Sequence, residues 1–176
     1  MRPSNNIVYL TGFMGSGKST AGKKLAASLG WAFIDLDKKI EQSTGKTIKE
    51  IFSESGESHF RELEAEMLKT MQTYNNTVIS AGGGTPCHGN NMDFMLETGV
   101  TVYLKLTPGQ LKSRLTGSLQ ERPLLKGLND EELLEFIREK LSSREKWYSR
   151  AEIIVDGFDP DIKYLQTLIE ERLGIC

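Results

Sequence analysis

The sequence predicts an α/β protein in which a five-stranded parallel sheet is covered by helices on both faces, within a single domain. Short β-prone runs alternate with helical runs along all 176 residues, which is the pattern of a three-layer parallel sheet. The first β-prone run leads through a glycine-rich turn into a helix. A chain of this length can bury about 70% of the surface that its unfolded form exposes, so one core is sufficient.

The expected strands are rich in β-branched and aromatic residues and occupy residues 7–10, 32–34, 77–80, 100–106 and 152–155. Helical runs fall between them, at residues 18–29, 38–44, 48–55, 59–74, 89–97, 108–115, 130–148 and 160–173. Thr107 before Pro108, and Asn129 before a run of acids, have the features of helix N-caps. Right-handed crossovers should bring the carboxyl ends of the strands to one edge, where ligands collect in such sheets.

Composition limits the classes of partner. Lysine and arginine (22) nearly balance aspartate and glutamate (24), and the formal charge of −2 disfavours a general nucleic-acid surface. Cys87 and Cys176 form no CxxC pair, which favours a reducing compartment and indicates no zinc site. The apolar runs are too short to cross a bilayer, and no signal peptide precedes the first strand. We therefore expect a cytoplasmic protein without nucleic-acid or membrane partners, and a monomer because no long apolar surface stripe is evident.

The glycine-rich turn matches the phosphate-binding pattern of Gly, four residues, Gly, Lys and Ser or Thr, from Gly12 to Ser19. Glycines let successive backbone N–H groups face a phosphate, and the N-terminus of the following helix adds partial positive charge. Lys18 can reach the outer phosphates, and the Ser19 hydroxyl is placed to ligate Mg²⁺. A plain glycine-rich turn with a chance lysine is the alternative, but both flanking elements lie where the motif requires them. The first ligand that we expect is a nucleoside triphosphate.

Two acids, Asp35 and Asp37, end the second expected strand. If the strand continued, alternation would point both side chains to one side, so that one could serve a metal and the other a substrate hydroxyl. Asp37 could instead act as a helix N-cap before Lys38, which would explain one acid but not two. Asp156, at the end of the last strand, is a competing candidate for the metal.

Arg61 opens a charged helical run and could simply pair with Glu57 or Glu64 on neighbouring turns. His59 and His88 are expected to be bystanders, because phosphoryl transfer to an alcohol needs no histidine and neither lies in a ligand-spaced cluster.

Three consecutive glycines, Gly82–Gly84, follow the third expected strand and would let a ligand touch the backbone directly. Residues 116–127 are polar and lack a period, so we expect a mobile loop that acts as a lid. Arg122 in this loop could close over phosphates as an anion clamp. Arg144 comes late in the long helical run that follows.

Together these residues resemble the motif set of the shikimate kinase family, in the right order and over nearly the whole chain. The matching elements are the phosphate-binding turn, the Asp35-Leu-Asp37 pair, Gly56-Glu57 with Phe60-Arg61 and Glu64, the glycine triplet, Arg122-Pro-Leu-Leu125, and Arg144 four residues before Tyr148. The resemblance implies a P-loop kinase fold and transfer of the γ-phosphoryl group of ATP to the 3-hydroxyl of shikimate, in the route to aromatic amino acids.

The resemblance also implies roles at the nucleotide. The residues that would hold the ATP phosphates are Gly15, Ser16, Gly17, Lys18, Ser19 and Thr20, joined by Arg122 from the lid. Ser19 and Asp35 would hold Mg²⁺, the latter through water. Arg114 is a candidate neighbour of the adenine ring.

At the acceptor, the resemblance implies that Arg61 and Arg144 grip the carboxylate of shikimate together with the Gly83 backbone. Asp37 would bind the hydroxyls and act as base or orienting group. Lys18, Asp37 and Arg122 would therefore be the catalytic residues. A planar guanidinium suits a carboxylate because it makes paired hydrogen bonds.

Two other functions compete with this interpretation. One is another small-molecule kinase on the same scaffold, for gluconate or a nucleoside monophosphate, which the acid-binding arginines disfavour. The other is an ATP-binding module without turnover. A guanine-specific switch is disfavoured because the sequence contains no Asn-Lys-x-Asp run.

Overall fold

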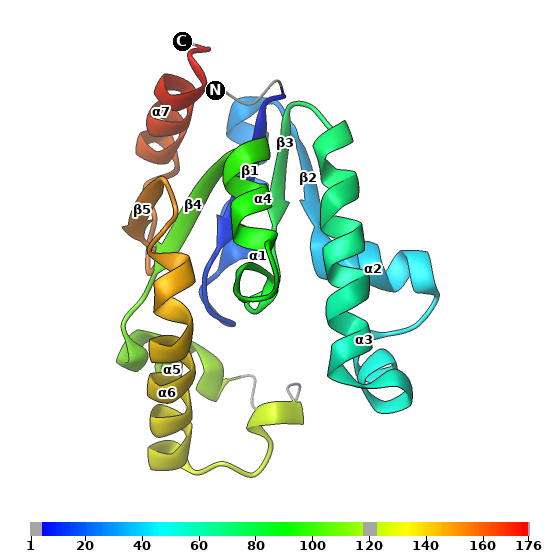
Figure 1. Ribbon diagram of the computed structural model, residues 1–176. Coiled ribbons are helices and arrows are strands. Elements are labelled where there is room, and N and C mark those ends of the chain that lie inside the picture. The colour runs from blue at the N-terminus through cyan, green and yellow to red at the C-terminus, as the bar shows by residue number, and fades with distance from the viewer. Residues whose placement is uncertain (1–4, 118–122, 176) are drawn as a thin grey trace.

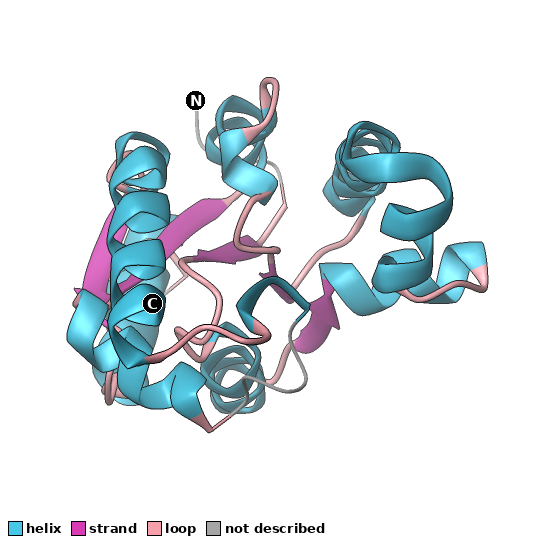
Figure 2. Cartoon of the chain, turned by 90° about the horizontal axis from the view of Figure 1, so that it is seen from below, coloured by secondary structure: helices cyan, strands magenta, loops and turns pink. Residues whose placement is uncertain are grey.

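A computed structural model describes residues 5–117 and 123–175 of the chain. Its five strands form one parallel sheet in the order β2-β3-β1-β4-β5. The strands are β1 (Ile7–Thr11), β2 (Ala32–Asp35), β3 (Thr77–Ser80), β4 (Val100–Lys105) and β5 (Ile153–Asp156). Helices lie on both sides of the sheet (Figure 1 and Figure 2), so the predicted three-layer α/β/α fold is confirmed.

The helices agree with most of the predicted runs. They are α1 (Lys18–Leu29), α2 (Leu36–Thr44), α3 (Ile48–Thr70), α4 (Asn91–Thr98), α5 (Pro108–Thr116), α6 (Asp130–Tyr148) and α7 (Ile162–Leu173). Both predicted N-caps are confirmed, because Thr107 and Asn129 each accept a hydrogen bond from the first turn and complete a capping box. Thr47 makes a third capping box, with Glu50, at the start of α3. This cap was not among the predicted ones.

Alternation along the strands divides the core between the two faces of the sheet. On β1, Ile7 and Tyr9 pack against the apolar side chains of α2, α3 and α4, whereas Val8 and Leu10 pack against those of α1 and α7. All four side chains are fully buried. A central strand covered on both faces explains why this run contains no charged side chain.

Helix α3 consists of two helical segments, as expected for residues 48–55 and 59–74. The segments meet at a kink at Gly56, whose backbone is not helical (φ 81°, ψ 172°). The helix ends at Thr70, and a short 3₁₀ turn, η1 (Met71–Thr73), follows. The kink redirects the second part of α3, which carries Arg61 and Glu64.

A smaller apolar cluster lies beyond the carboxyl edge of the sheet. Phe13 from the turn after β1 packs there with Leu111 and Leu115 of α5 and Leu133 of α6. Leu125 of the 3₁₀ turn η4 (Pro123–Leu125) is fully buried in the same cluster. One end of the predicted lid is thus anchored to α5 and α6, while residues 118–122, and with them Arg122, lie outside the described part of the chain. The mobility of the lid stays a prediction.

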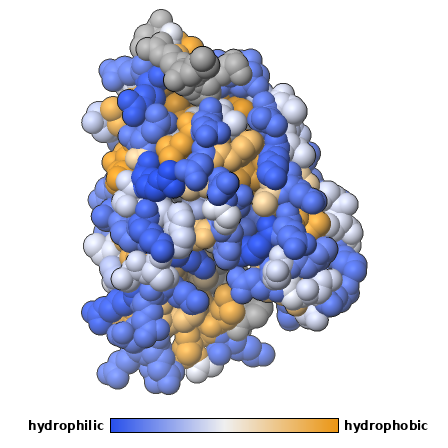
Figure 3. Space-filling view, viewed as in Figure 1, coloured by the Kyte–Doolittle hydropathy of each residue, from blue (hydrophilic) through white to orange (hydrophobic). Residues whose placement is uncertain are grey.

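No helix among the described residues is both long and apolar enough to span a membrane. The large apolar side chains that are exposed lie apart along the sequence, at Phe52, Leu124, Ile154, Phe158, Tyr164 and Ile175. Figure 3 shows polar residues over most of the face that it presents, with apolar patches between them.

Candidate active site

The candidate site lies at the carboxyl ends of three adjacent strands. The phosphate-binding turn follows β1, the two acids follow β2, and the glycine triplet follows β3. Since these strands are parallel neighbours in the order β2-β3-β1, the three segments meet at one edge of the sheet. They line a cavity of about 400 Å³ that includes Lys18, Ser19, Asp35, Asp37 and Gly83.

Backbone conformation explains the glycines of the phosphate-binding turn. Gly12, Gly15 and Gly17 have φ values of 147°, 78° and 84°, which side chains of other residues disfavour. A Cβ at Gly15 would lie 2.8 Å from the Leu115 side chain, and one at Gly17 would lie 2.8 Å from Arg114 Nη1. Gly17 is also the N-cap of α1 and has no side chain to satisfy the first N–H groups of the helix. These N–H groups are therefore oriented as in an anion site.

Lys18 and Ser16 are almost fully buried in this turn. The Lys18 ammonium donates hydrogen bonds to the carbonyl oxygens of Gly12 (2.8 Å) and Phe13 (3.0 Å). The lysine thus folds back over its own turn, at the place where phosphate oxygens are expected. Thr20, the last residue of the predicted phosphate cradle, lines the same cavity as Lys18.

Oxygen atoms suited to Mg²⁺ gather beside the turn. The Ser19 hydroxyl donates to Asp35 Oδ2 at 2.8 Å, and the Ser80 hydroxyl lies 3.5 Å from that of Ser19. Hard oxygen donors are the ligands that Mg²⁺ prefers, usually with phosphate oxygens and water completing its shell. Within the described ranges there is no cluster of three or more His, Cys, Asp or Glu that could hold a metal.

The structure corrects two expectations about the acids. Strand β2 ends at Asp35, and Asp37 lies in the first turn of α2, so strand alternation does not bring the two side chains together. The N-cap is Asp35 rather than Asp37, because Asp35 accepts a hydrogen bond from the Lys38 N–H. Asp156 ends β5, which is separated from β2 by three strands of the sheet, and it does not line the 400 Å³ cavity.

Asp37 occupies an environment that disfavours its charge. Burial raises its pKa to about 6, and the neighbouring carboxylates of Glu64 and Asp35 add to the rise. The positive charges of Lys18 and Arg61 act in the opposite direction. A carboxyl group with this pKa is ionised at neutral pH yet basic enough to take a proton, as general bases are.

Each glycine of the triplet makes room for a different charged side chain. A Cβ at Gly82 would lie 3.0 Å from Asp37 Oδ1, and one at Gly84 would lie 2.6 Å from Arg61 Nη2. A Cβ at Gly83 would lie 3.4 Å from Arg144 Nη1. The triplet was predicted to let a ligand approach the backbone. In the structure it lets the protein's own functional groups approach, and it thereby brings Asp37, Arg61 and Arg144 together.

Arg61 pairs with acids on its own helix, which is the simpler of the two possibilities that its sequence neighbours suggested. Its guanidinium donates to Glu64 (2.8 Å) and Glu57 (3.3 Å). Glu64 is fully buried and also accepts a hydrogen bond from the Thr85 hydroxyl at 2.5 Å. Arg61 Nε is buried and has no hydrogen-bond partner in the described part of the chain. The ion pairs therefore hold the Arg61 side chain beside Gly84, so that it does not extend into solvent.

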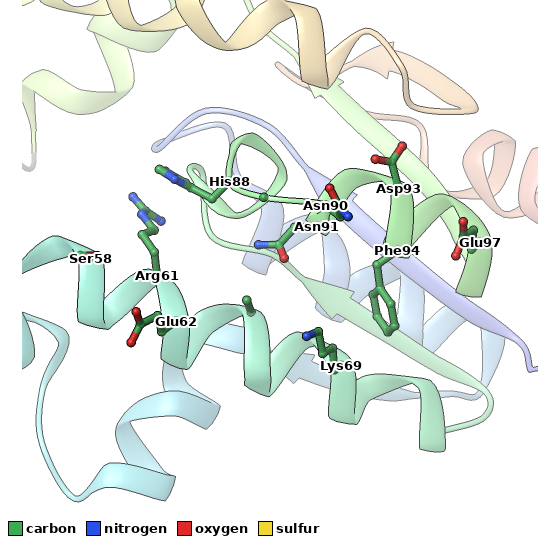
Figure 4. A pocket seen from close by; sticks show the side chains of 12 residues that line it. Ser58, Arg61, Glu62, Lys69, His88, Asn90, Asn91, Asp93, Phe94 and Glu97 are labelled. Atoms are coloured by element: carbon green, nitrogen blue, oxygen red, sulfur yellow. The ribbon is translucent and has the colours of Figure 1, made fainter.

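Arg61 also reaches a second cavity of about 690 Å³, which lies between α3 and α4. Figure 4 shows Arg61 and His88 extending toward the same end of this cavity, with Phe94, Asp93 and Glu97 along α4. His59 lies on an exposed part of α3, 3.9 Å from Glu62.

Arg144 approaches the glycine triplet from α6. Its guanidinium lies 5.6 Å from the centre of the Phe13 ring, a cation–π distance. Arg114 lies further along, where its guanidinium donates to the carbonyl oxygens of Gly157 and Phe158 and stacks 5.3 Å from the Phe158 ring. A cavity of about 220 Å³ adjoins it, lined also by Gly17 and Thr20. The candidate adenine position is thus continuous with the phosphate-binding turn.

Two residues with site contacts were absent from the predicted set of site residues. Glu64 holds Arg61 and Thr85, and Tyr148 donates a hydrogen bond to the Gly83 carbonyl. For Glu64 the signal was its spacing of three residues from Arg61 on a helix. The contact of Tyr148 spans 65 residues and has no local signal.

The fold and the arrangement of a phosphate-binding turn, paired acids and nearby arginines define a P-loop kinase. Comparison with known proteins gives the family. The family model described as shikimate kinase matches residues 14–171, and this chain belongs to the shikimate kinase family.

Named relatives agree with this assignment. A shikimate kinase of Bacteroides thetaiotaomicron is 43% identical over 171 residues, which cover 93% of this chain and 98% of the relative. One of Chlorobium luteolum is 42% identical over 172 residues, covering 95% and 83%.

Solved structures extend the likeness to three dimensions. The crystal structure of the Bacteroides thetaiotaomicron shikimate kinase has a TM-score of 0.88 at 42% identity and covers 97% of this chain and 99% of that one. The shikimate kinase of Acinetobacter baumannii, solved in complex with shikimate, has a TM-score of 0.82 at 31% identity, covering 97% and 94%. A gluconokinase of Sinorhizobium meliloti, at 20% identity and a TM-score of 0.54, shares the fold.

Proposed function

We propose that this protein transfers the γ-phosphoryl group of ATP to the 3-hydroxyl of shikimate, giving shikimate 3-phosphate and ADP. The observation that carries the proposal is the convergence of Asp37, Arg61 and Arg144 on the glycine triplet, beside the cavity lined by Lys18. Asp37 would thus accept a hydrogen bond from a substrate hydroxyl, and the two arginines would bind a substrate carboxylate, next to the proposed phosphate cradle. The names of the relatives, one of them solved with shikimate, support the same substrate.

The nucleotide would bind along the turn after β1. Backbone N–H groups of Gly15, Ser16, Gly17 and the start of α1 would surround the phosphates. Thr20, which lines the same cavity as Lys18, would complete the cradle. Lys18 would exchange its bonds to two carbonyl oxygens for bonds to phosphate oxygens. Arg114 and the Phe158 ring would flank the adenine.

Ser19 and Asp35 would hold Mg²⁺. The ion supplies positive charge that neutralises the β- and γ-phosphate oxygens when the nucleotide is bound. Asp35 would keep its hydrogen bond to the α2 backbone at the other carboxylate oxygen, so that its orientation does not depend on the metal.

The acceptor would lie between Asp37 and the glycine triplet. Arg61, Arg144 and the Gly83 N–H would bind the carboxylate, which leaves the 3-hydroxyl facing Asp37. Asp37 would orient this hydroxyl and accept its proton as the oxygen attacks the γ-phosphorus. Lys18 stabilises negative charge on the transferring group, and Arg122 would join it from the lid.

An assay of ADP release with shikimate, gluconate and AMP tests the proposal, together with mass-spectrometric detection of the phosphorylated product. We expect turnover with shikimate and little above background with the other two. The Asp37→Asn variant should lose turnover by at least about a hundredfold, since general-base help is worth 10² to 10⁴. Faster turnover of gluconate or AMP would contradict the substrate, and ATP binding without product would contradict catalysis.

We also propose that the protein is a cytoplasmic monomer of a single domain, without nucleic-acid or membrane partners. The scattered positions of the exposed apolar side chains and the unpaired thiol of Cys87 support this. Size-exclusion chromatography with light scattering should give the mass of one chain, 19.7 kDa.

A further inference from the structure

Tyr148 lies at the end of α6 and is fully buried, so its hydroxyl needs a hydrogen-bond partner inside the protein. The partner is the carbonyl oxygen of Gly83, at 2.5 Å. A side chain of α6, the last helix before β5, thus holds Gly83, the middle residue of the glycine triplet. Arg144 is adjacent to Gly83, and Arg61 is adjacent to Gly84.

This hydrogen bond determines the direction of a peptide group. In a trans peptide the C=O and the following N–H point in opposite directions, so the bond to the Gly83 carbonyl turns the Gly84 N–H away from Tyr148. Neither the Gly83 nor the Gly84 N–H donates to another of the residues that the structure describes. Both amides are therefore left for a ligand, between the two arginine side chains.

Tyr148 also acts on Arg144, which lies one helical turn earlier on the same face of α6. Burial raises the pKa of Tyr148, and the charge and hydrogen bonding of Arg144 partly oppose the rise. The hydroxyl therefore stays protonated at neutral pH and continues to donate to Gly83.

A neighbouring tyrosine provides a matched comparison. The ring of Tyr103 lies 5.0 Å from that of Tyr148 and is equally buried. Its hydroxyl donates to Glu145 at 2.9 Å, and Glu145 also pairs with Lys105, the last residue of β4. Tyr103 thus shares the packing and the burial of Tyr148 but makes no hydrogen bond to the glycine triplet.

We propose that Tyr148 is a positioning residue for the carboxylate-binding part of the acceptor site, and that its hydroxyl selects acidic over neutral acceptors. It does so by orienting the Gly83–Gly84 peptide and steadying Arg144 at the same time. This inference rests on the proposed function, because it assumes that an acid binds beside the glycine triplet.

The test compares shikimate with its methyl ester, which keeps the hydroxyls but lacks the negative charge. For Tyr148→Phe we expect kcat/KM with shikimate to fall about five- to tenfold, the worth of one hydrogen bond, through a higher KM at nearly unchanged kcat. The value for the ester should hardly change. The acid-to-ester preference, a ratio independent of the fraction of folded enzyme, should therefore fall by the same factor. Tyr103→Phe should keep the preference of the parent enzyme.

Several outcomes would overturn the inference. An unchanged preference in Tyr148→Phe would mean that the hydroxyl does not act on the carboxylate. Equal losses for acid and ester, or the same loss in Tyr103→Phe, would indicate a general packing effect. A parent enzyme that phosphorylates neither compound would instead refute the proposed function on which the inference rests.

Discussion

Asp37 is largely buried and has two acidic neighbours, and this environment destabilises the folded protein when the Asp37 carboxyl is ionised. In an unfolded chain its carboxyl titrates near 3.8, whereas in the folded protein burial, Glu64 and Asp35 raise its pKa to about 6. Between these two values the folded state binds a proton that the unfolded state has released. The contribution of Asp37 to stability is therefore fully present below pH 3.8 and is lost as the pH rises through 6.

The first prediction concerns activity. The kcat/KM for shikimate should rise tenfold per pH unit below pH 6 and level off above it, because only the ionised Asp37 can accept the hydroxyl proton. A pH profile of kcat/KM from pH 4.5 to 8 measures this acidic limb, the rise in activity below pH 6. The residual activity of Asp37→Asn should show no such rise. A limb that persists in that variant would belong to another group.

The second prediction concerns stability. Asp37→Asn should make the protein more stable at pH 7 by about 3 kcal/mol, because it removes a carboxylate whose ionisation the fold disfavours. Urea unfolding at pH 7 and at pH 3.5 measures the difference, which should vanish at the lower pH, where the carboxyl is protonated in both states. Asp159→Asn makes the same change at an exposed carboxyl and should be neutral. Destabilisation of Asp37→Asn at pH 7 would contradict the proposed cost.

At the level of residues, the motifs led us to expect that Lys18, Ser19 and Asp37 lie close together, and in the structure the three line one cavity. It could not show that Asp35 is the helix cap, because that depends on where β2 ends. Tyr148 could not be assigned a contact either, since its hydrogen bond joins residues that only the folded chain brings together.

Helix α3 depends on the conformation of Gly56, which lies in a region of φ and ψ that is almost exclusive to glycine. The third prediction is that Gly56→Ala costs about 1 to 3 kcal/mol of stability. A Cβ there would meet no other atom within 4 Å, so the cost comes from the backbone alone. Urea unfolding measures it, and a rise in KM for shikimate should accompany it because the kink orients Arg61. An unchanged stability would mean that the helix straightens freely.

The glycine triplet allows a fourth prediction, made with a matched control. Gly84 has ordinary backbone angles (φ −90°, ψ −12°), so alanine fits the backbone there, but its Cβ would lie within 2.9 Å of three guanidinium atoms of Arg61. Gly84→Ala should raise the KM for shikimate at least tenfold, the effect of losing about 1.5 kcal/mol from a charged hydrogen bond. The KM for ATP should not change.

Gly109→Ala is the control for that prediction. Gly109 lies in the first turn of α5 and has open space around it. Alanine there should leave both KM values unchanged and add up to about 1 kcal/mol of stability, because it restricts the unfolded chain. A large effect of Gly84→Ala on ATP, or an equal effect of both variants, would argue against displacement of Arg61.

The existence of the elements was easier to predict than their junctions. Apolar periodicity predicted every strand of the sheet to within about two residues. The signal is strongest for β1, β3 and β4, whose residues are almost all buried. Periodicity predicted the two helical segments on either side of Gly56, but it did not show where the second one ends. That segment was expected to reach residue 74, whereas α3 ends at Thr70 and the turn η1 follows.

The whole molecule has one sheet and a core on each of its faces. Trp31 packs against the cluster with α1 and α7, and Trp147 packs against the cluster on the other face. Since β1, β3 and β4 contribute to both clusters, we expect the two faces to unfold together.

The fifth prediction uses these two tryptophans, the only ones in the chain. Trp31→Phe and Trp147→Phe leave one reporter on each face. In each variant the urea midpoint from tryptophan fluorescence should coincide with the midpoint from far-ultraviolet circular dichroism. Separate midpoints in either variant would show that one face unfolds alone, and would contradict a single cooperative domain.

At this scale the sequence predicted a three-layer parallel sheet but not its strand order. Alternating strands and helices are compatible with several orders, and only the crossovers in the folded chain place β3 between β2 and β1. That order brings the glycine triplet between the acids and the phosphate-binding turn, so the composition of the site follows from topology.

The proposed phosphate cradle and the proposed anchors for the acceptor come from different segments. The cradle belongs to β1 and α1, whereas Arg61 and Arg144 stand on α3 and α6. Substitutions on these two helices can therefore alter which alcohol is accepted while leaving the transfer machinery intact. Such a division lets gene duplication produce new specificities from an old catalyst, because one scaffold can carry different acceptor sites.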